Sequence, residues 1–163
     1  MDFSAVQGIF NSFPIHWFFL GGFFVLVVLD SLRSGTARAT ALAIALPFAS
    51  FLTSLIPATA FIKDQTFITQ GYGPLIVFGV LFVVMYMLVR RMGIEHFESG
   101  RGEPIQSLLA AIAVSAALIV TWMHTPALSA LWTLGEPFTS LFAEPYRLFW
   151  LLGAFLGLAF ARG

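Results

Sequence analysis

Three histidines are the side chains of this sequence best suited to chemistry, and they lie far apart. His16 stands just before Trp17, His96 lies in a charged segment, and His124 comes two positions after Trp122. If the fold brought His16 and His124 together, their two imidazoles could hold a metal ion or a haem iron. A histidine close to a tryptophan is more typical of a side chain that anchors a helix at a membrane interface. We therefore expect no metal and no cofactor.

The charged segment 90–103 has the residue types of a metal site without a matching arrangement. It contains Glu95, His96, Glu98 and Arg101, whose signs alternate as they do in a short solvated loop. The chain has no cysteine, which excludes thiolate metal sites, cysteine nucleophiles and disulfides together. It also lacks the Gly-x-Ser-x-Gly, phosphate-loop and His-Glu-x-x-His patterns of common hydrolases and nucleotide-binding enzymes. These observations predict a protein that is not an enzyme.

Four long apolar runs form the framework that would position any function. They cover residues 13–29, 39–62, 74–89 and 105–123, and none of them contains Asp, Glu, Lys or Arg. A helix needs about 17–25 apolar residues to cross a hydrocarbon core of about 30 Å, and each run comes close to that length. Charged residues make up 10% of the chain, against about 25% in soluble domains. We predict an all-α fold, a polytopic transmembrane helical bundle of four to five spans that forms a single integral membrane domain over residues 1–163.

Basic residues are unevenly placed between these runs, although the formal net charge is zero and indicates no nucleic-acid partner. One set of loops contains five arginines: Arg33, Arg38, Arg90, Arg91 and Arg101. The other side has only Lys63 and Arg147 before the C-terminus. Since short cytoplasmic loops collect Lys and Arg, this predicts an N-terminus outside, in a bacterial inner membrane or a viral membrane.

Two segments outside the four runs are predicted to lie in the membrane interface. Residues 2–12 place apolar side chains at spacings of three and four, as an amphipathic helix does. Residues 127–144 carry an apolar stripe that Gly135-Glu136-Pro137 divides, so we expect two short interfacial helices with a turn between them. Residues 146–161 are apolar except for Arg147 and are expected to form a fifth span. An interfacial hairpin is the alternative for this last segment.

Small residues indicate which helices pack closely, because close approach in lipid needs Gly, Ala or Ser. In the second run, alanines recur at every fourth position: Ala37, Ala41, Ala45 and Ala49. Gly153 and Gly157 form a similar step, which could face a neighbour in the same chain or in another subunit. The second and fourth runs, rich in alanine, are expected inside the bundle. The third run is bulky, with Phe78 and Phe82, and is expected to meet lipid.

Two prolines interrupt the second run. Pro47 and Pro57 would leave the carbonyls of Ala43 and Thr53 without their usual helical donors. Broken helices of this kind line ion or substrate sites in transporters. The simpler hypothesis is that the hydroxyls of Thr53 and Ser54 satisfy the freed backbone groups locally.

One segment carries a family resemblance. Residues 29–38, Leu-Asp-Ser-Leu-Arg-Ser-Gly-Thr-Ala-Arg, form a basic, glycine-containing turn between two apolar runs. This turn resembles the first hairpin of the colicin V production protein family. The resemblance implies a membrane protein of similar length, with four spans and an amphipathic C-terminal part. The start of the fourth run departs from the family pattern, because Gly102-Glu-Pro-Ile-Gln-Ser lacks the expected arginine.

These features predict a non-enzymatic membrane subunit that acts by helix-mediated assembly within a larger complex, such as a secretion, energy-transducing or viral assembly. Its partners would be the lipid bilayer and either other membrane protein subunits or further copies of the chain. The alternative is a small channel or holin-like pore, made by homo-oligomerisation. Its lining would be the hydroxyl residues of the second run: Ser50, Thr53, Ser54 and Thr59.

Overall fold

The computed structural model describes residues 15–56, 71–92, 103–136 and 138–161, and 87% of these residues are helical. Five of the described helices are long: α2 (Ile15–Ser34), α3 (Ala37–Leu55), α5 (Gly73–Arg91), α6 (Pro104–His124) and α9 (Arg147–Ala161). Between α6 and α9 the described residues form three short helical turns: α7 (Pro126–Ser129), α8 (Phe138–Leu141) and the 3₁₀ turn η3 (Glu144–Tyr146). No strand occurs in these residues, so the all-α prediction is confirmed. The helices α2, α3, α5 and α6 are long and apolar enough to cross a membrane.

The helices begin and end near the limits of the apolar runs, with some differences. Helix α2 continues for a further turn beyond residue 29, because Asp30 is only partly buried and the charge can reach water. Gly35 then adopts a φ of 78°, a left-handed conformation that favours glycine, and the chain reverses. Arg38, in the first turn of α3, donates to the Asp30 carboxylate across this reversal at 3.3 Å. Helix α3 ends at Leu55, and both residues 57–62 and the expected interfacial helix 2–12 lie outside the described residues.

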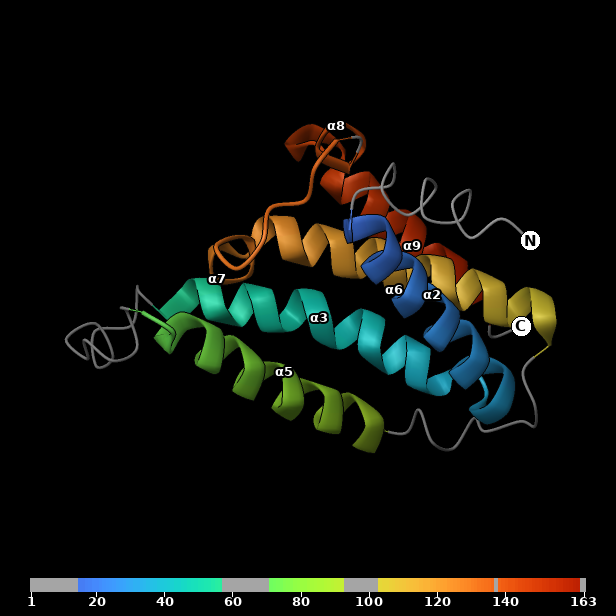
Figure 1. Ribbon diagram of the computed structural model, residues 1–163. Helices are drawn as coiled ribbons and strands as arrows, with labels where there is room; N and C mark the ends of the chain where they lie inside the picture. Colours follow the sequence, from blue (N-terminus) through green and yellow to red (C-terminus); the bar gives the residue numbers. More distant parts are fainter. Residues whose placement is uncertain (1–14, 57–70, 93–102, 137, 162–163) are drawn as a thin grey trace, which may run out of the picture.

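Helix α6 lies at the centre of the bundle, where it packs against α2, α3 and α9 (Figure 1). Helix α3 lies between α6 and α5, which places α5 on the outside. Consecutive long helices run in opposite directions, and α9 runs back along α6 (Figure 1). The C-terminal ends of α2, α5 and α9 therefore lie at the same end of the bundle as the N-terminal ends of α3 and α6.

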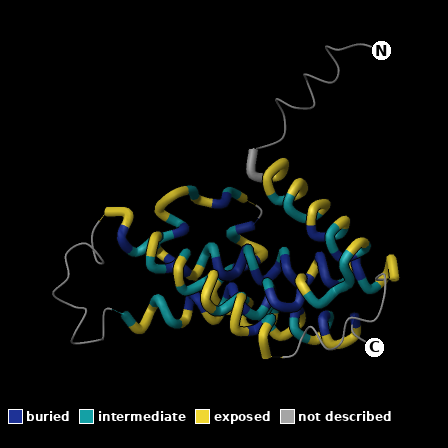
Figure 2. The backbone as a smooth tube through the Cα atoms, turned by 90° about the horizontal axis from the view of Figure 1, so that it is seen from below, coloured by how far each residue is buried: buried dark blue, intermediate teal, exposed yellow. Residues whose placement is uncertain are grey.

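Burial follows the distribution of small side chains. Figure 2 shows buried positions concentrated in the middle of the bundle and exposed positions along its outer helices. Helices α3 and α6 contain most of the buried residues, whereas α5 buries only Gly73, Phe78 and Val89 among its described residues. This is the order of burial expected from the sequence, because alanine and serine allow a helix to be approached from several sides at once.

The expectation for the third run is wrong in one respect, since its aromatic face points inward. Phe78 is 7% exposed and packs in one cluster with Ala49 of α3. Phe82 is half-buried and its ring stacks on that of Phe78, with 6.4 Å between the centroids. A bulky ring fills the space that a small alanine leaves, so a large face on α5 complements the alanine-rich helix. The outward face of α5 consists instead of aliphatic residues, among them Val80 and Met87.

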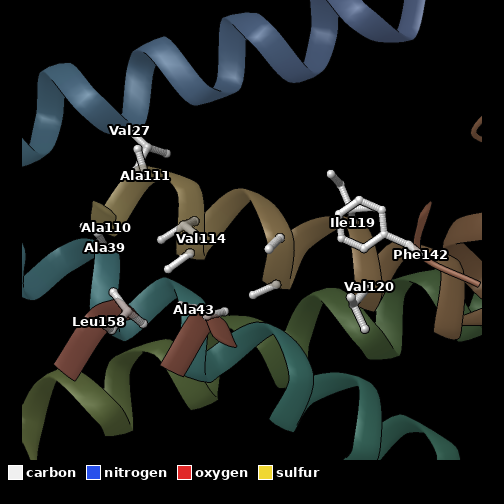
Figure 3. Close-up of a cluster of buried hydrophobic side chains, with 14 of the residues drawn as sticks. Val27, Ala39, Ala43, Ala110, Ala111, Val114, Ile119, Val120, Phe142 and Leu158 are labelled. Atoms are coloured by element: carbon white, nitrogen blue, oxygen red, sulfur yellow. The ribbon is translucent and has the colours of Figure 1, made fainter. Parts of the chain in front are cut away.

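The core forms where three helices meet α6 (Figure 3). Val27 of α2 lies against Ala111, and Leu158 of α9 lies beside Ala39 of α3 and Ala110 of α6. All five side chains are at most 5% exposed. The alanines keep the helix axes close, so the larger Val27 and Leu158 can reach the same core from opposite sides.

The segment between α6 and α9 is held against the bundle by two tryptophans. The indole N–H of Trp122 donates to the carbonyl of Trp132 at 2.8 Å, and that of Trp150 donates to the carbonyl of Leu141 at 2.8 Å. The ring of Trp150 also packs on Phe142, with 4.6 Å between the centroids. This segment contains two short helices, α7 and α8, of four residues each, on either side of Gly135 and Glu136, as expected from the divided apolar stripe.

Candidate functional site

The predicted packing residues of the second run lie inside the bundle. Ala41, Ala45 and Ala49 have no exposed surface, while Ala37, at the first position of α3, is partly exposed. Helix α3 packs against both α5 and α6, so this alanine face is covered by helices of the same chain. Ala37 is partly exposed to solvent because it lies at the end of the bundle, beside the turn at Gly35.

The glycine step of the last helix lies on a flank of α9, beside the face that packs in the core. Ala154 and Leu158 are buried, whereas Gly153 is exposed and Gly157 partly so. A Cβ built on either glycine would have no side chain or neighbouring helix within 4 Å. Within the described part of the chain no helix covers this step, so a contact there stays a prediction for another protein.

A groove of about 640 Å³ lies beside Gly153 on this outer surface. It is lined by Ser140, Leu141, Tyr146, Phe149, Trp150 and Gly153. The hydrogen bond from the Trp150 indole to Leu141 holds one wall of the groove in place. The groove is therefore a preformed, largely apolar surface feature of α9.

The predicted topology residues gather at one end of the bundle. Arg33, Arg38, Arg90 and Arg91 lie at the junction of α2 with α3 and at the end of α5 (Figure 1). The guanidinium of Arg38 pairs with Asp30, and that of Arg90 lies over the Tyr86 ring, 5.8 Å from its centroid. Arg101 lies outside the described residues, and Arg147 lies at the other end, at the start of α9.

A recess of about 350 Å³ opens at the end of the bundle opposite to the four arginines. It lies where α3 ends, α5 begins and α6 meets α7. Among the described residues its walls come from eight: Ser50, Thr53, Ser54, Pro74, His124, Thr125, Pro126 and Ala127. Three hydroxyl residues of the proposed pore lining thus lie together with one of the candidate histidines, while Thr59 lies outside the described residues.

The hydroxyl groups of the recess are already hydrogen-bonded within the chain. The Ser50 and Thr125 hydroxyl oxygens lie 2.7 Å apart, and both side chains are buried. Thr53 donates to the Ala49 carbonyl at 2.8 Å, and Ser54 donates to the Phe51 carbonyl at 2.6 Å. The hydroxyls of Thr53 and Ser54 therefore do not satisfy the backbone carbonyls of Ala43 and Thr53, and that hypothesis is wrong. A hydroxyl in a helix reaches the carbonyl three or four residues before it.

The structure describes the side chain of one of the three histidines, so the pairing of His16 with His124 stays untested. His124 is exposed at the end of α6, and the side chains of His16 and His96 lie outside what the structure describes. Among the described residues no group of three His, Cys, Asp or Glu side chains could hold a metal ion. The structure does bring together the hydroxyl residues of the recess. Sequence analysis missed one of them, Thr125, whose hydroxyl pairs with that of Ser50. Thr125 ends α6, because Pro126 begins α7 directly after it.

One carboxylate outside the long helices has a shifted pKa. The hydroxyl of Thr139 donates to Glu136 at 2.6 Å, and this bond, with a smaller contribution from Ser140, lowers the pKa of the fully exposed Glu136. The interaction joins the residue before Pro137 to the first turn of α8.

Comparison of the chain with protein-family models, with curated proteins and with solved structures finds no match. The resemblance to colicin V production proteins therefore rests on the turn at residues 29–38 alone.

Proposed function

We propose that this protein is an integral membrane protein of five spans, with its N-terminus outside and its arginine-rich end in the cytoplasm. The four helices that are long and apolar enough to cross a membrane support the proposal, as does the position of four arginines at one end of the bundle. Helix α9 has 15 residues, about 22 Å at 1.5 Å per residue. It would span a thinned bilayer, with Arg147 extended toward the headgroups.

Its proposed role is that of a non-enzymatic subunit, which assembles into a larger membrane complex through the outer face of α9. The observation that carries this role is the open glycine step at Gly153 and Gly157, with a groove beside it. In lipid, glycine on an outward face permits a second helix to approach at backbone distance, and the groove can receive one of its side chains. Large apolar residues flank the step, among them Leu156 and Phe160.

The channel or holin-like pore is the second candidate, and the geometry favours it less. Its lining would be the hydroxyl stripe of α3, but Ser50 is buried against Thr125 of the same chain. Helix α3 also has α5 on one side and α6 on the other. A pore lined by α3 in a ring of copies would require these contacts to be broken.

The assembly role is tested by Gly157→Ile, with Gly79→Ile as the matched control. A Cβ at either glycine meets no neighbouring side chain or helix within 4 Å, so both variants should fold, and thermal unfolding checks this. After extraction in a mild detergent, Gly157→Ile should lose most of the co-eluting partner or higher oligomer, because the branched side chain holds the backbones apart. Gly79→Ile should keep it. Equal co-elution for the two variants, or single-channel currents from the purified protein in planar bilayers, would count against the assembly role.

A further inference from the structure

The hydroxyl-lined recess at the ends of α3 and α6 is not needed for assembly through α9, and its chemistry is specific enough to suggest a ligand. The described residues that line it are all different from those of the groove beside α9, and none of them belongs to that helix. An inference about its ligand is therefore independent of the assembly role.

The hydrogen bonds of the recess leave it rich in acceptors. Thr53 and Ser54 each donate their hydroxyl hydrogen to a backbone carbonyl, so both oxygens are left to accept. Between Ser50 and Thr125 one hydroxyl donates to the other, which uses one of their two hydrogens. The described lining of the recess thus has four hydroxyl oxygens and a single uncommitted hydroxyl hydrogen. A ligand that donates hydrogen bonds matches this arrangement, and one that accepts them does not.

The charges around the recess favour a cation. Within the part of the chain that the structure describes, no Lys, Arg, Asp or Glu lines the recess, and His124 is its one titratable side chain. The helices α3 and α6 both end there, and a helix C-terminus carries a partial negative charge. Helix α5 begins at the recess and contributes the opposite partial charge. Two long helices end at the recess, and one long helix and the single turn of α7 begin there, so the long helices leave a negative balance.

The size and the remaining walls favour an organic cation over a bare metal ion. A water molecule takes up about 30 Å³ in the liquid, so a recess of about 350 Å³ is far larger than a single ion requires. Besides the hydroxyls, Pro74, Pro126 and Ala127 supply an apolar surface. A ligand with a charged donor at one end and a short hydrocarbon stem at the other would contact both surfaces.

We propose that the recess binds a primary ammonium group carried on a short apolar stem. The N–H donors of the ammonium would face the hydroxyls of Thr53 and Ser54, with the buried pair of Ser50 and Thr125 behind them, and the stem would lie against the prolines. Two sources present this chemistry at a membrane surface: a free amine in solution, and the ethanolamine headgroup of a phospholipid.

The first test compares two cations on the full-length protein in a non-ionic detergent. Calorimetric titration with ethylammonium chloride should give saturable binding. Tetramethylammonium chloride carries the same charge but has no N–H donor, and should give none. Equal binding of the two cations, or no saturable binding of ethylammonium, would overturn the proposal.

The second test uses variants that remove acceptors and controls that remove the same kind of bond elsewhere. Thr53→Val and Ser54→Ala together should weaken ethylammonium binding about tenfold or more, because hydrogen bonds to a charged group are strong. Thr40→Val is the control for Thr53, because both hydroxyls donate to the carbonyl four residues before them. Ser129→Ala is the control for Ser54, because both hydroxyls donate to the carbonyl three residues before them. Neither control residue lines the recess, so both should bind within about twofold of the unmodified chain.

Thermal unfolding without ligand shows whether each variant is folded. If the double variant does not fold, Ser54→Ala alone carries the test, because its hydroxyl is exposed and its loss leaves no buried group unpaired. A folded recess variant that binds ethylammonium as tightly as the controls would overturn the proposal.

A third measurement distinguishes the two sources. Nanodiscs of phosphatidylethanolamine should lower the apparent affinity for ethylammonium by competition if the headgroup occupies the recess, whereas nanodiscs of phosphatidylcholine should not, since choline has no N–H. Equal affinities in the two kinds of nanodisc, with saturable binding in both, would assign the recess to a free amine. Displacement by phosphatidylcholine alone would contradict recognition of a primary ammonium.

Discussion

The hydroxyl oxygens of Ser50 and Thr125 lie 2.7 Å apart in the interior of the protein, although 75 positions separate the two residues in the sequence. The bond joins the C-terminal part of α3 to the residue that ends α6, at the base of the recess. Both side chains are at most 5% exposed, so neither can exchange its partner for bulk water. The pair therefore stabilises the two most buried helices relative to each other at this end.

Removing both members of this pair should cost less than the sum of the costs of removing each one alone. Ser50→Ala leaves the Thr125 hydroxyl buried without its partner, and Thr125→Val does the same to Ser50, with a cost of about 1–3 kcal/mol for each change. The double variant loses both polar groups, so its destabilisation should be smaller than the sum of the two. Denaturant or thermal unfolding of the four proteins in detergent measures this coupling. Additive effects would show that the hydroxyls do not depend on each other.

A larger side chain at Ala45 should destabilise the bundle. Ala45 has no exposed surface on a helix that is covered from two sides, and overpacking of this kind typically costs about 1–3 kcal/mol. The matched control is Val80→Leu, which also adds volume but lies on the outer face of α5, where Val80 is 58% exposed. Its effect should stay within about 0.5 kcal/mol. Equal melting temperatures for Ala45→Leu and Val80→Leu would contradict the interior position of this alanine.

The helices and their order of burial could be predicted from the sequence because both depend on local composition. Uncharged runs of sufficient length form the helices, and the alanines of α3 and α6 allow close packing on several sides. The inward orientation of Phe78 and the bond between Ser50 and Thr125 could not be predicted, because each depends on which residue of a distant helix lies opposite. The path of residues 130–136 could not be predicted either, because it depends on the hydrogen bond from Trp122 to a carbonyl ten residues further on.

The lowered pKa of Glu136 should make the local stability of α8 depend on pH. Because the pKa is lower in the folded protein than in the unfolded chain, the contribution is present above the unfolded pKa and is lost as the pH falls through the folded pKa. Thr139→Val removes the largest cause of the shift, so the pKa of Glu136 should rise toward its ordinary value. Carbon-detected NMR titration of the labelled glutamate carboxyl measures this directly. The smaller change expected for Ser140→Ala is the control, and an unchanged pKa in Thr139→Val would contradict the assigned cause.

The proposed orientation can be tested with single cysteines, since the natural chain has none. Met92 is 80% exposed at the arginine-rich end of the bundle, and Thr133 is exposed at the other end. In intact cells, an impermeant thiol reagent should label Thr133→Cys and leave Met92→Cys unlabelled until the membrane is opened, because the basic end is expected in the cytoplasm. Labelling of Met92→Cys from outside, with Thr133→Cys protected, would reverse the orientation.

The number of spans depends on α9, for which the two models give opposite positions of the C-terminus. Helix α9 runs back along α6, so its end lies at the arginine-rich end of the bundle (Figure 1). If the long helices cross the membrane and α9 crosses with them, a reporter fused after Gly163 lies in the cytoplasm, and one fused after Met123 lies outside. A green fluorescent protein fused after Gly163 should then fluoresce, while alkaline phosphatase at the same position should be inactive and should become active after Met123. Active phosphatase after Gly163 would place the C-terminus outside. In that case residues 146–161 would be an interfacial hairpin, α9 would have to separate from α6, and Leu158 would leave the core cluster that it shares with Ala110.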